Sequence, residues 1–260
     1  MSSRKTPSQD PLEALCALLV RFGLTTVARR LSEMLAQAEK THPAYTEFLS
    51  TLLSAEEAVR WERRIQRRQR WSKLGPPVGL DHFDWSIRPQ LSPQVVKELL
   101  TCRFVEERRN VILVGRPSTG KTTVARALGH AACARGMSVY YGGTAGILEM
   151  LHAARADGTY RKVFRRVTQP DLLVMDDAGF STLGRDATNE LFRLVCARYR
   201  ERSTIVVTNL SFRRWEEFLP SPAQAVAIAD RLIDQATVLR FSGKPGRNPR
   251  DVYGAPLEGE

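Results

Sequence analysis

Residues 111–123 read Val-Ile-Leu-Val-Gly-Arg-Pro-Ser-Thr-Gly-Lys-Thr-Thr, and they carry the strongest prediction of a fold class in this sequence. The initial aliphatic run predicts a strand that is buried on both faces. The next eight residues fit G-x-x-x-x-G-K-[ST], in which glycines let the backbone wrap around a phosphate. A helix-forming sequence, TTVARALGHAA, follows, so the backbone N–H groups of a helix start would point at the anion. The expected nucleotide-binding residues are Gly115, Arg116, Pro117, Ser118, Thr119, Gly120, Lys121, Thr122 and Thr123.

Two side chains of this loop would act on the nucleotide directly. Lys121 would reach the β- and γ-phosphates, and the hydroxyl group of Thr122 would ligate Mg²⁺. The alternative is a Gly-Pro turn followed by a surface lysine, and the flanking strand and helix patterns argue against it. The loop therefore predicts a nucleoside triphosphate and Mg²⁺ as cofactors.

Downstream of the loop, short apolar runs alternate with amphipathic stretches, as in SVYYGG, AGILEMLHAARADG and DLLVMDD. This alternation predicts an α/β domain with a parallel sheet between helices. Asp176 and Asp177 end the run Leu172–Met175, and a carboxylate there would lie where ligands of such sheets bind. We expect Asp176 to hold Mg²⁺ and Asp177 to polarise the attacking water. An Asp pair after a strand is more often a cap or turn, but the phosphate loop upstream favours the functional interpretation.

A further apolar run, STIVVTN, ends in Asn209. If this strand lies between the strands of the two motifs, Asn209 points at the γ-phosphate and can hold a water molecule. A strand-ending asparagine in a turn is equally compatible with the spacing.

The first 80 residues have a different pattern, with leucines and valines at helical spacing and no β-type alternation. The helical pattern ends in AEEAVRWERRIQRRQRWSKL, and the GPPVG that follows cannot continue a helix. We therefore expect a small all-helical, basic domain over residues 1–80 and the nucleotide-binding domain over residues 81–260.

The composition narrows the class of protein. The 39 Lys and Arg residues exceed the 28 Asp and Glu residues, so the net charge of +11 favours anionic partners such as nucleic acid. The four cysteines are too scattered for a zinc cluster and suggest reduced thiols in a cytosolic protein. No apolar run is long enough to cross a bilayer, and the start of the chain lacks the apolar stretch of a signal peptide. Membrane, secreted and disulfide-rich classes are thereby excluded.

Two segments concentrate the positive charge. In the helix expected over residues 55–73, Trp61 and Ile65 would face a core and leave the arginines on the other side. In TYRKVFRRV, an apolar face opposes a basic one. Such clusters are usually solvated surfaces, but two of them in a basic chain favour phosphate neutralisation on DNA, without sequence readout. Few aromatic side chains are expected to be exposed there, which favours duplex over single-stranded DNA. The expected DNA contacts are Arg60, Arg63, Arg64, Arg67, Arg68, Arg161, Lys162, Arg165 and Arg166.

The chain as a whole resembles the IstB-type ATPases, which are transposition helper proteins of bacterial insertion sequences and AAA+ relatives of the helicase loader DnaC. The phosphate loop, LLVMDDAG, LFRLVCARYRERSTIVVTN, Phe212-x-x-Trp215 and AIADRLID carry the resemblance. AEEAVRWERRIQRRQRWSKL and LDHFDW extend it to nearly all of residues 12–250. It implies an AAA+ P-loop ATPase that binds ATP with Mg²⁺, forms a homo-oligomer on duplex DNA and presents this DNA to a cognate transposase. The implied location is the bacterial cytoplasm, at the nucleoid when the protein is on DNA.

The resemblance also assigns roles that spacing alone leaves open. It places Asn209 at the sensor-1 position and makes Arg231 the arginine finger that reaches the γ-phosphate in a neighbouring subunit. An intrachain salt bridge with Asp230 or Asp234 is the alternative for Arg231. The implied catalytic residues are Asp177, Asn209 and Arg231.

Three departures from the family pattern modify these expectations. Asp177 stands where many AAA+ proteins have Glu, which predicts slow hydrolysis that assembly, DNA or transposase would stimulate. The segment Gly243–Arg247 keeps only the Gly and Arg of the family's Gly-x-Ser-Tyr-Arg, which argues against ATP sensing by Arg247. The short remainder after TVLRF predicts that the helical lid is largely absent.

Two other classes compete with the helper ATPase. A DnaC-like replicative helicase loader would engage a helicase and prefer single strands. A small-molecule P-loop kinase would need a substrate lid and would have no use for the basic N-terminal helix.

Overall fold

The computed structural model describes residues 10–81, 83–86, 90–179 and 182–242. The chain divides into two compact units, Met1–Gln66 and Arg67–Glu260. The division falls inside a helix, earlier than the expected boundary after residue 80. The reason is packing: Leu74 is 1% exposed and belongs to the core of the second unit. The expectations that Arg247 does not sense ATP and that the helical lid is largely absent concern residues 243–260, which lie outside the described residues.

The first unit is helical, as predicted. It contains α1 (Pro11–Arg21), α2 (Thr25–Thr41) and the greater part of α3 (Tyr45–Ser72). Val27, Leu31 and Leu52 form its small core. The start of α2 is capped by the buried Glu56 of α3, whose carboxylate accepts hydrogen bonds from the backbone N–H groups of Thr26 and Val27. These bonds satisfy donors that have no partner within the helix.

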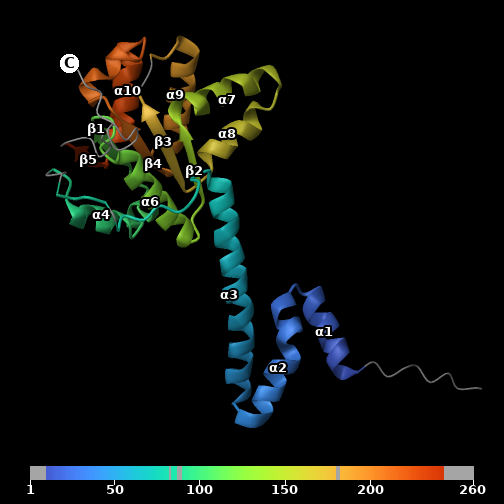
Figure 1. Cartoon of the computed structure of the whole chain (residues 1–260). Coiled ribbons are helices and arrows are strands. Elements are labelled where there is room, and N and C mark those ends of the chain that lie inside the picture. Colours follow the sequence, from blue (N-terminus) through green and yellow to red (C-terminus); the bar gives the residue numbers. More distant parts are fainter. Residues whose placement is uncertain (1–9, 82, 87–89, 180–181, 243–260) are drawn as a thin grey trace, which may run out of the picture. The chain divides into compact units, whose positions relative to one another are not determined.

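The second unit contains a five-stranded sheet in the order β2-β3-β4-β1-β5, with parallel pairing between all neighbours (Figure 1). The strands are β1 (Val111–Gly115), β2 (Val139–Gly143), β3 (Leu172–Ala178), β4 (Ser203–Thr208) and β5 (Thr237–Phe241). The helices are α4 (Pro93–Leu99), α5 (Arg103–Glu106), α6 (Lys121–Ala134), α7 (Thr144–Ala156), α8 (Tyr160–Thr168), α9 (Arg185–Arg198) and α10 (Pro222–Ile233), with the 3₁₀ helix η1 (Phe212–Glu217).

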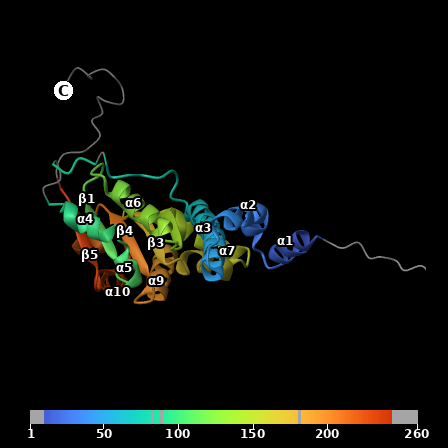
Figure 2. The ribbon, with the colours of Figure 1, turned by 90° about the horizontal axis from the view of Figure 1, so that it is seen from below.

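Helices cover both faces of this sheet, which explains the continuous apolar runs of the strands. Val111 and Leu113 of β1 join a core with α4, α5 and α6, whereas Ile112 joins a core with α7, α9 and α10. Figure 2 shows the sheet between α6 and α10. The predicted α/β class, with a parallel sheet between helices, is confirmed. None of the described helices is both long and apolar enough to span a bilayer.

Candidate nucleotide-binding site

The phosphate loop connects β1 to α6, as the motif requires. At Gly115 a Cβ atom would lie 2.1 Å from the backbone oxygen of Phe241 on the adjacent strand, so no side chain fits. Gly120 has a φ of +89°, a conformation that glycine adopts without strain. It precedes the first residue of α6, and no side chain caps this helix start. The first N–H groups of α6 are therefore suited to receive an anion.

Lys121 lies within the loop and is only 6% exposed. Its Nζ atom donates hydrogen bonds to the backbone oxygens of Gly115 at 2.8 Å and Arg116 at 2.7 Å. Burial lowers the pKa of this amine, and the carboxylates of Asp176 and Asp177 oppose the shift. The loop thus holds a cation close to the turn that would wrap a phosphate.

Asp176 meets the loop from β3. It is 4% exposed, and its Oδ1 atom accepts hydrogen bonds from the hydroxyl of Thr122 at 3.2 Å and from the backbone N–H of Asp177 at 3.0 Å. The two residues expected to hold Mg²⁺ are therefore in direct contact. The fold brings them together because β1 and β3 are parallel, and both end at the same edge of the sheet.

Two further residues bind Asp176 and were not anticipated from the sequence. The hydroxyl of Tyr141, on the neighbouring strand β2, donates to Oδ2 at 2.5 Å, and the hydroxyl of Thr144 donates to the backbone oxygen at 2.9 Å. Burial, followed by the hydrogen bond and charge of Asp176, raises the pKa of Tyr141, so this hydroxyl stays a donor. The only signal was the pair of tyrosines near the end of SVYYGG, and sequence alone does not place that strand beside β3.

Asp177 sits at an irregularity of the sheet. The β3–β4 register shifts between Met175 and Ala178, and Asp177 has a φ of +52°. This bulge exposes Asp177, whereas Asp176 beside it is buried. Partial desolvation and then the charge of Asp176 raise the pKa of Asp177, while Lys121 lowers it. The carboxylate therefore has the accessibility that a water-polarising group needs.

Asn209 follows β4, which lies between β3 and β1 in the sheet. This strand order is the condition under which Asn209 would face the phosphates. The side chain is half-buried at the edge where the loop and Asp176 lie. Its role as the sensor residue stays a prediction.

Arg231 does not lie at the end of the sheet where the phosphate loop, Asp176 and Asn209 are found. It is near the end of α10, where the backbone oxygens of Arg231 and Leu232 accept hydrogen bonds from Asn110, the residue before β1. The phosphate loop follows the other end of β1, so Arg231 is remote from the site of its own chain. Its guanidinium donates to the backbone oxygen of Ala227 and lies 5.4 Å from the ring centre of Phe192. In the described part of the chain, no ion pair joins Arg231 to Asp230 or Asp234.

The basic face predicted for residues 160–167 is present on α8. Arg161, Lys162, Arg165 and Arg166 are exposed, whereas Val167 is buried. A buried carboxylate fixes this helix: Glu190 of α9 accepts hydrogen bonds from Tyr160 at 2.6 Å and from Nε of Arg155 at 2.7 Å. The helix that carries these cations is therefore tied to α9 through Tyr160.

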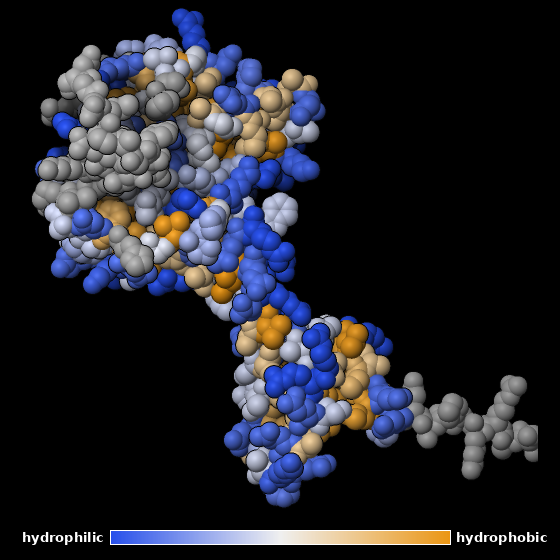
Figure 3. Space-filling model, viewed as in Figure 1, coloured by the Kyte–Doolittle hydropathy of each residue, from blue (hydrophilic) through white to orange (hydrophobic). Residues whose placement is uncertain are grey.

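The arginines predicted to contact DNA on α3 differ in exposure and in pairing. Arg63, Arg64 and Arg67 are exposed, whereas Arg68 is half-buried. Arg60 is engaged inside the first unit, where it binds Glu56 at 3.1 Å and the backbone oxygen of Gly23 at 2.8 Å. Figure 3 shows mostly hydrophilic surface over the later part of α3.

The prediction that Trp61 faces a core is wrong. Trp61 is 43% exposed, and only Phe48 and Leu52 of the described α3 residues join the helical core. The part of α3 that contains Trp61 lies beyond the residues that pack in this core. Trp71 is 68% exposed, so the expectation of few exposed aromatic side chains on this basic helix is wrong as well.

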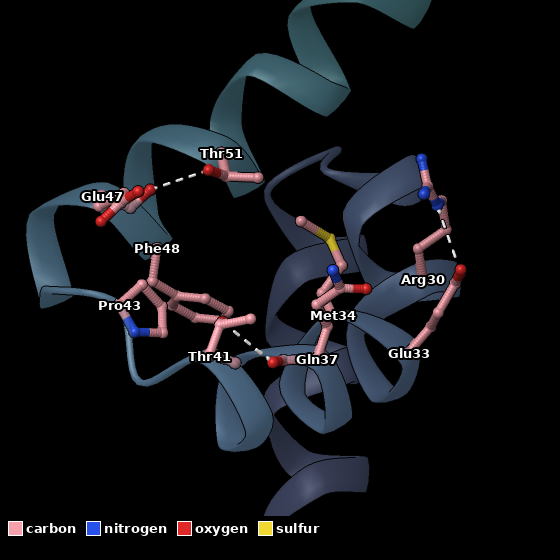
Figure 4. Close-up of a pocket in the computed structure, with 10 residues that line it drawn as sticks. Arg30, Glu33, Met34, Gln37, Thr41, Pro43, Glu47, Phe48 and Thr51 are labelled. Atoms are coloured by element: carbon pink, nitrogen blue, oxygen red, sulfur yellow. Dashed lines mark hydrogen bonds and ion pairs between the residues drawn. The ribbon is translucent and has the colours of Figure 1, made fainter.

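The helical unit also has a pocket of about 330 Å³ between α2 and α3 (Figure 4). Met34 of α2 and Phe48 of α3 contribute to its lining, and Arg30 and Glu33 form an ion pair of 3.5 Å there. None of the residues predicted for nucleotide or DNA binding lines this pocket.

Comparisons with known proteins agree with the geometry. The family model described as "IstB-like ATP binding protein" matches residues 17–251. The putative ATP-binding protein of insertion sequence IS5376 from Geobacillus stearothermophilus is 31% identical, over 87% of this chain and 90% of that protein. The corresponding IS21 protein from Pseudomonas aeruginosa is 30% identical, over 91% of this chain and 89% of that protein.

Two solved structures share the fold. The DnaC helicase loader superposes with a TM-score of 0.52 at 22% identity, over 57% of this chain and 87% of that one. AMPPCP-bound DnaA from Aquifex aeolicus superposes with a TM-score of 0.56 at 22% identity, over 65% of this chain and 51% of that one. These likenesses establish the AAA+ P-loop ATPase fold of the second unit.

Proposed function

Because the chain belongs to the family of IstB-like ATP-binding proteins, we propose that it is a transposition helper ATPase that assembles on duplex DNA with ATP and presents this DNA to a cognate transposase. The main observation in support of the proposal is that Lys121, Thr122 and Asp176 lie together at the edge of the sheet that the carboxyl ends of the strands form. In the cell, the protein would act in the cytoplasm at the nucleoid.

The donors at this edge fit Mg²⁺. The hydroxyl of Thr122 and the carboxylate of Asp176 are hard oxygen donors, which this ion prefers. The described residues contain no cluster of three or more acidic, histidine or cysteine side chains suited to a metal ion. This agrees with an ion held by one or two protein groups and by the phosphates of a nucleotide. When bound, Mg²⁺ would neutralise phosphate charge, with Thr122 and Asp176 holding it.

Hydrolysis would rely on three side chains of the same edge. Lys121 would stabilise negative charge on the phosphates, Asn209 would hold the attacking water, and Asp177 would accept its proton. The aspartate side chain is one methylene shorter than the glutamate found in many AAA+ proteins, so its reach to the water is reduced. We therefore expect slow turnover that assembly, DNA or transposase accelerates.

The arginine finger would act between subunits. Arg231 lies beside the start of β1, whereas its own phosphate loop follows the end of this strand. It would therefore contact the nucleotide of a neighbouring subunit. A positive charge supplied in this way stabilises the transition state of phosphoryl transfer. ATP would then be fully coordinated only in the homo-oligomer.

DNA binding would rest on the cations of α3 and α8, of which all but the half-buried Arg68 are exposed. Lysine and arginine side chains at this density gain affinity by releasing counterions from the phosphate backbone, which does not depend on base sequence. The contacts proposed are Arg63, Arg64, Arg67 and Arg68 of α3, with Arg60 in a secondary role because Glu56 engages it, and Arg161, Lys162, Arg165 and Arg166 of α8.

A helicase loader is the second candidate. The likeness in fold to DnaC and the exposed Trp61 and Trp71 favour it, because aromatic side chains stack on the bases of single strands. A loader would bind a replicative hexameric helicase, whereas a transposition helper would not.

Sedimentation velocity of the full chain with and without ATP, on a duplex of several helical turns, tests the proposal. We expect large complexes only when ATP and duplex are both present, and stimulation of the transposase encoded beside this protein's gene. Assembly that does not depend on ATP would contradict the proposal. So would association with a replicative helicase in place of the transposase.

A further inference from the structure

The last turn of α3 exposes a large aromatic side chain. Trp71 is 68% exposed, whereas Trp215 of the same unit is 1% exposed and Trp85 packs partly buried against the core. Tryptophan is among the side chains with most to gain from burial, and it is highly buried on average. A tryptophan left in water at this position is therefore suited to a ligand with an aromatic or apolar face.

Several basic residues lie near this side chain in the sequence. Arg67 and Arg68 precede Trp71 by four and three residues, so they lie on the same side of the helix. Arg70 and Lys73 flank it in the sequence, and both are exposed. Arg68 has a carboxylate partner: Asp171 lies 3.8 Å from Arg68, and it is shared with Arg202 at 3.0 Å. The basic residues near Trp71 in the sequence therefore carry more charge than this carboxylate can neutralise.

Lys73 also lies close to a residue of the second basic segment. Lys73, directly after α3, lies 5.3 Å from the ring centre of Tyr140, and Arg166 of α8 lies 5.7 Å from the same ring centre. The two segments are far apart in the sequence, and the fold of the second unit brings their cations to one ring. Tyr140 itself is buried, but Lys73 and Arg166 are exposed, and exposed like charges that lie close together attract a polyanion.

We propose that Trp71 stacks on an unpaired base of the DNA that these cations hold, so that the protein prefers duplexes containing unpaired nucleotides to fully paired ones. The proposal rests on the proposed function, because it requires DNA binding. In a paired duplex the faces of each base are covered by its neighbours, whereas an unpaired base can leave the stack and offer its face to the indole. Stacking of a base on an aromatic side chain is expected to increase affinity by about tenfold.

A protein partner fits this surface less well. Arginine and tryptophan are both frequent at protein–protein interfaces, whereas lysine is depleted there. A partner that covered Trp71 would have to desolvate the neighbouring arginines as well. The phosphates beside an unpaired base, in contrast, would pair with them.

The test compares two duplexes of equal length and sequence, one fully paired and one with three adjacent mismatches at its centre. Fluorescence anisotropy with the full chain and ATP gives both affinities. We expect wild-type protein to bind the mismatched duplex about tenfold more tightly. Trp71→Ala should bind both duplexes equally, and Trp71→Phe, which keeps a ring, should retain most of the preference.

Tyr45→Ala is the matched control, since Tyr45 is a 91% exposed aromatic residue of the same helix outside its basic part. It should keep the wild-type ratio, and thermal unfolding of all variants should match that of the wild type because both side chains are exposed. Equal wild-type affinities for the two duplexes, or an unchanged ratio in Trp71→Ala, would overturn the inference and leave the proposed function intact. Absence of binding to either duplex would overturn both. A Trp71→Ala variant with a wild-type ratio but weaker self-association would show that Trp71 contacts protein, which also overturns the inference.

Discussion

Lys121 is a buried cation whose hydrogen-bond acceptors belong to its own loop. Its Nζ atom contacts the backbone oxygens of Gly115 and Arg116, so the ammonium group is held where the β- and γ-phosphates are expected. A phosphate would offer this group a full negative charge in place of carbonyl dipoles. The side chain therefore has more to contribute to nucleotide binding than to the loop itself.

Replacing Lys121 by alanine is expected to weaken ATP binding by about 2 kcal/mol or more, because a charge-assisted hydrogen bond is lost. Isothermal titration calorimetry measures this change. Lys97→Ala removes an exposed lysine of α4 and should bind ATP like the wild type. An unchanged ATP affinity in Lys121→Ala would refute the assignment of the phosphate loop.

The hydroxyl of Tyr141 is a positioning group, since it holds one oxygen of Asp176 while Thr122 holds the other. Tyr141→Phe should raise the Mg²⁺ concentration needed for half-maximal binding of a fluorescent ATP analogue by about tenfold, as expected when a metal ligand loses its outer hydrogen bond. Affinity for the analogue without Mg²⁺ should stay unchanged.

Tyr140→Phe is the matched control for this experiment. Tyr140 precedes Tyr141, and its hydroxyl contacts the sulfur of Met150 at 3.8 Å, so it should not affect Mg²⁺. If Tyr141→Phe has the Mg²⁺ dependence of the wild type, Tyr141 only fills space beside Asp176.

Among the elements, α8 has the clearest division into an apolar and a basic face. Tyr160, together with Arg155 of α7, ties it to Glu190 of α9, so alanine substitutions on the basic face leave these anchors in place. On α3, in contrast, substitution of Arg60 would remove a structural contact, because its guanidinium is bound to Glu56.

Removing Arg161 and Arg165 together should lower the salt dependence of duplex binding. Each phosphate contact contributes about 0.9 to the slope of log K against log salt, so the slope should fall by about two. Anisotropy titrations at several salt concentrations give this slope. Lys97→Ala combined with Arg185→Ala removes two exposed cations elsewhere and should leave it unchanged. An equal reduction in both double variants would mean that α8 contributes only to the general charge of the protein.

For the whole molecule, the position of Arg231 matters most. Arg231 lies beside the start of β1, whereas the phosphate loop follows the end of this strand. A single chain would therefore hold an incomplete ATP site. If a neighbour completes it, nucleotide binding and assembly must strengthen each other. DNA would add to this coupling by raising the local concentration of subunits.

Arg231→Ala should therefore bind ATP as a monomer and fail to form the large complex on DNA. Sedimentation velocity with ATP and a long duplex provides the measurement, and thermal unfolding reports any loss of packing against Phe192. Arg103→Ala, which removes an exposed arginine paired with Glu107, should assemble normally. Wild-type assembly by Arg231→Ala would remove this residue from the subunit interface.

The amino-acid sequence alone determined the parallel α/β architecture, the phosphate loop, the Asp176 motif, the helical first unit and the basic face of α8. These features follow from local rules: the apolar period of each segment, the positions of glycine and proline, and motifs within single connections. Patterns within single segments of the sequence suffice to predict them.

Which distant segments meet depends on long-range packing, which the sequence patterns do not reveal. Strand order placed β4 between β3 and β1, brought Tyr141 to Asp176 and set Arg231 beside the start of β1, away from the loop. The exposure of Trp61 and the approach of Lys73 and Arg166 to Tyr140 were likewise invisible in the sequence. The physical reason is the same in each case. A helical period shows that a helix has an apolar side, but whether that side is covered, and by what, depends on the partners that long-range packing supplies.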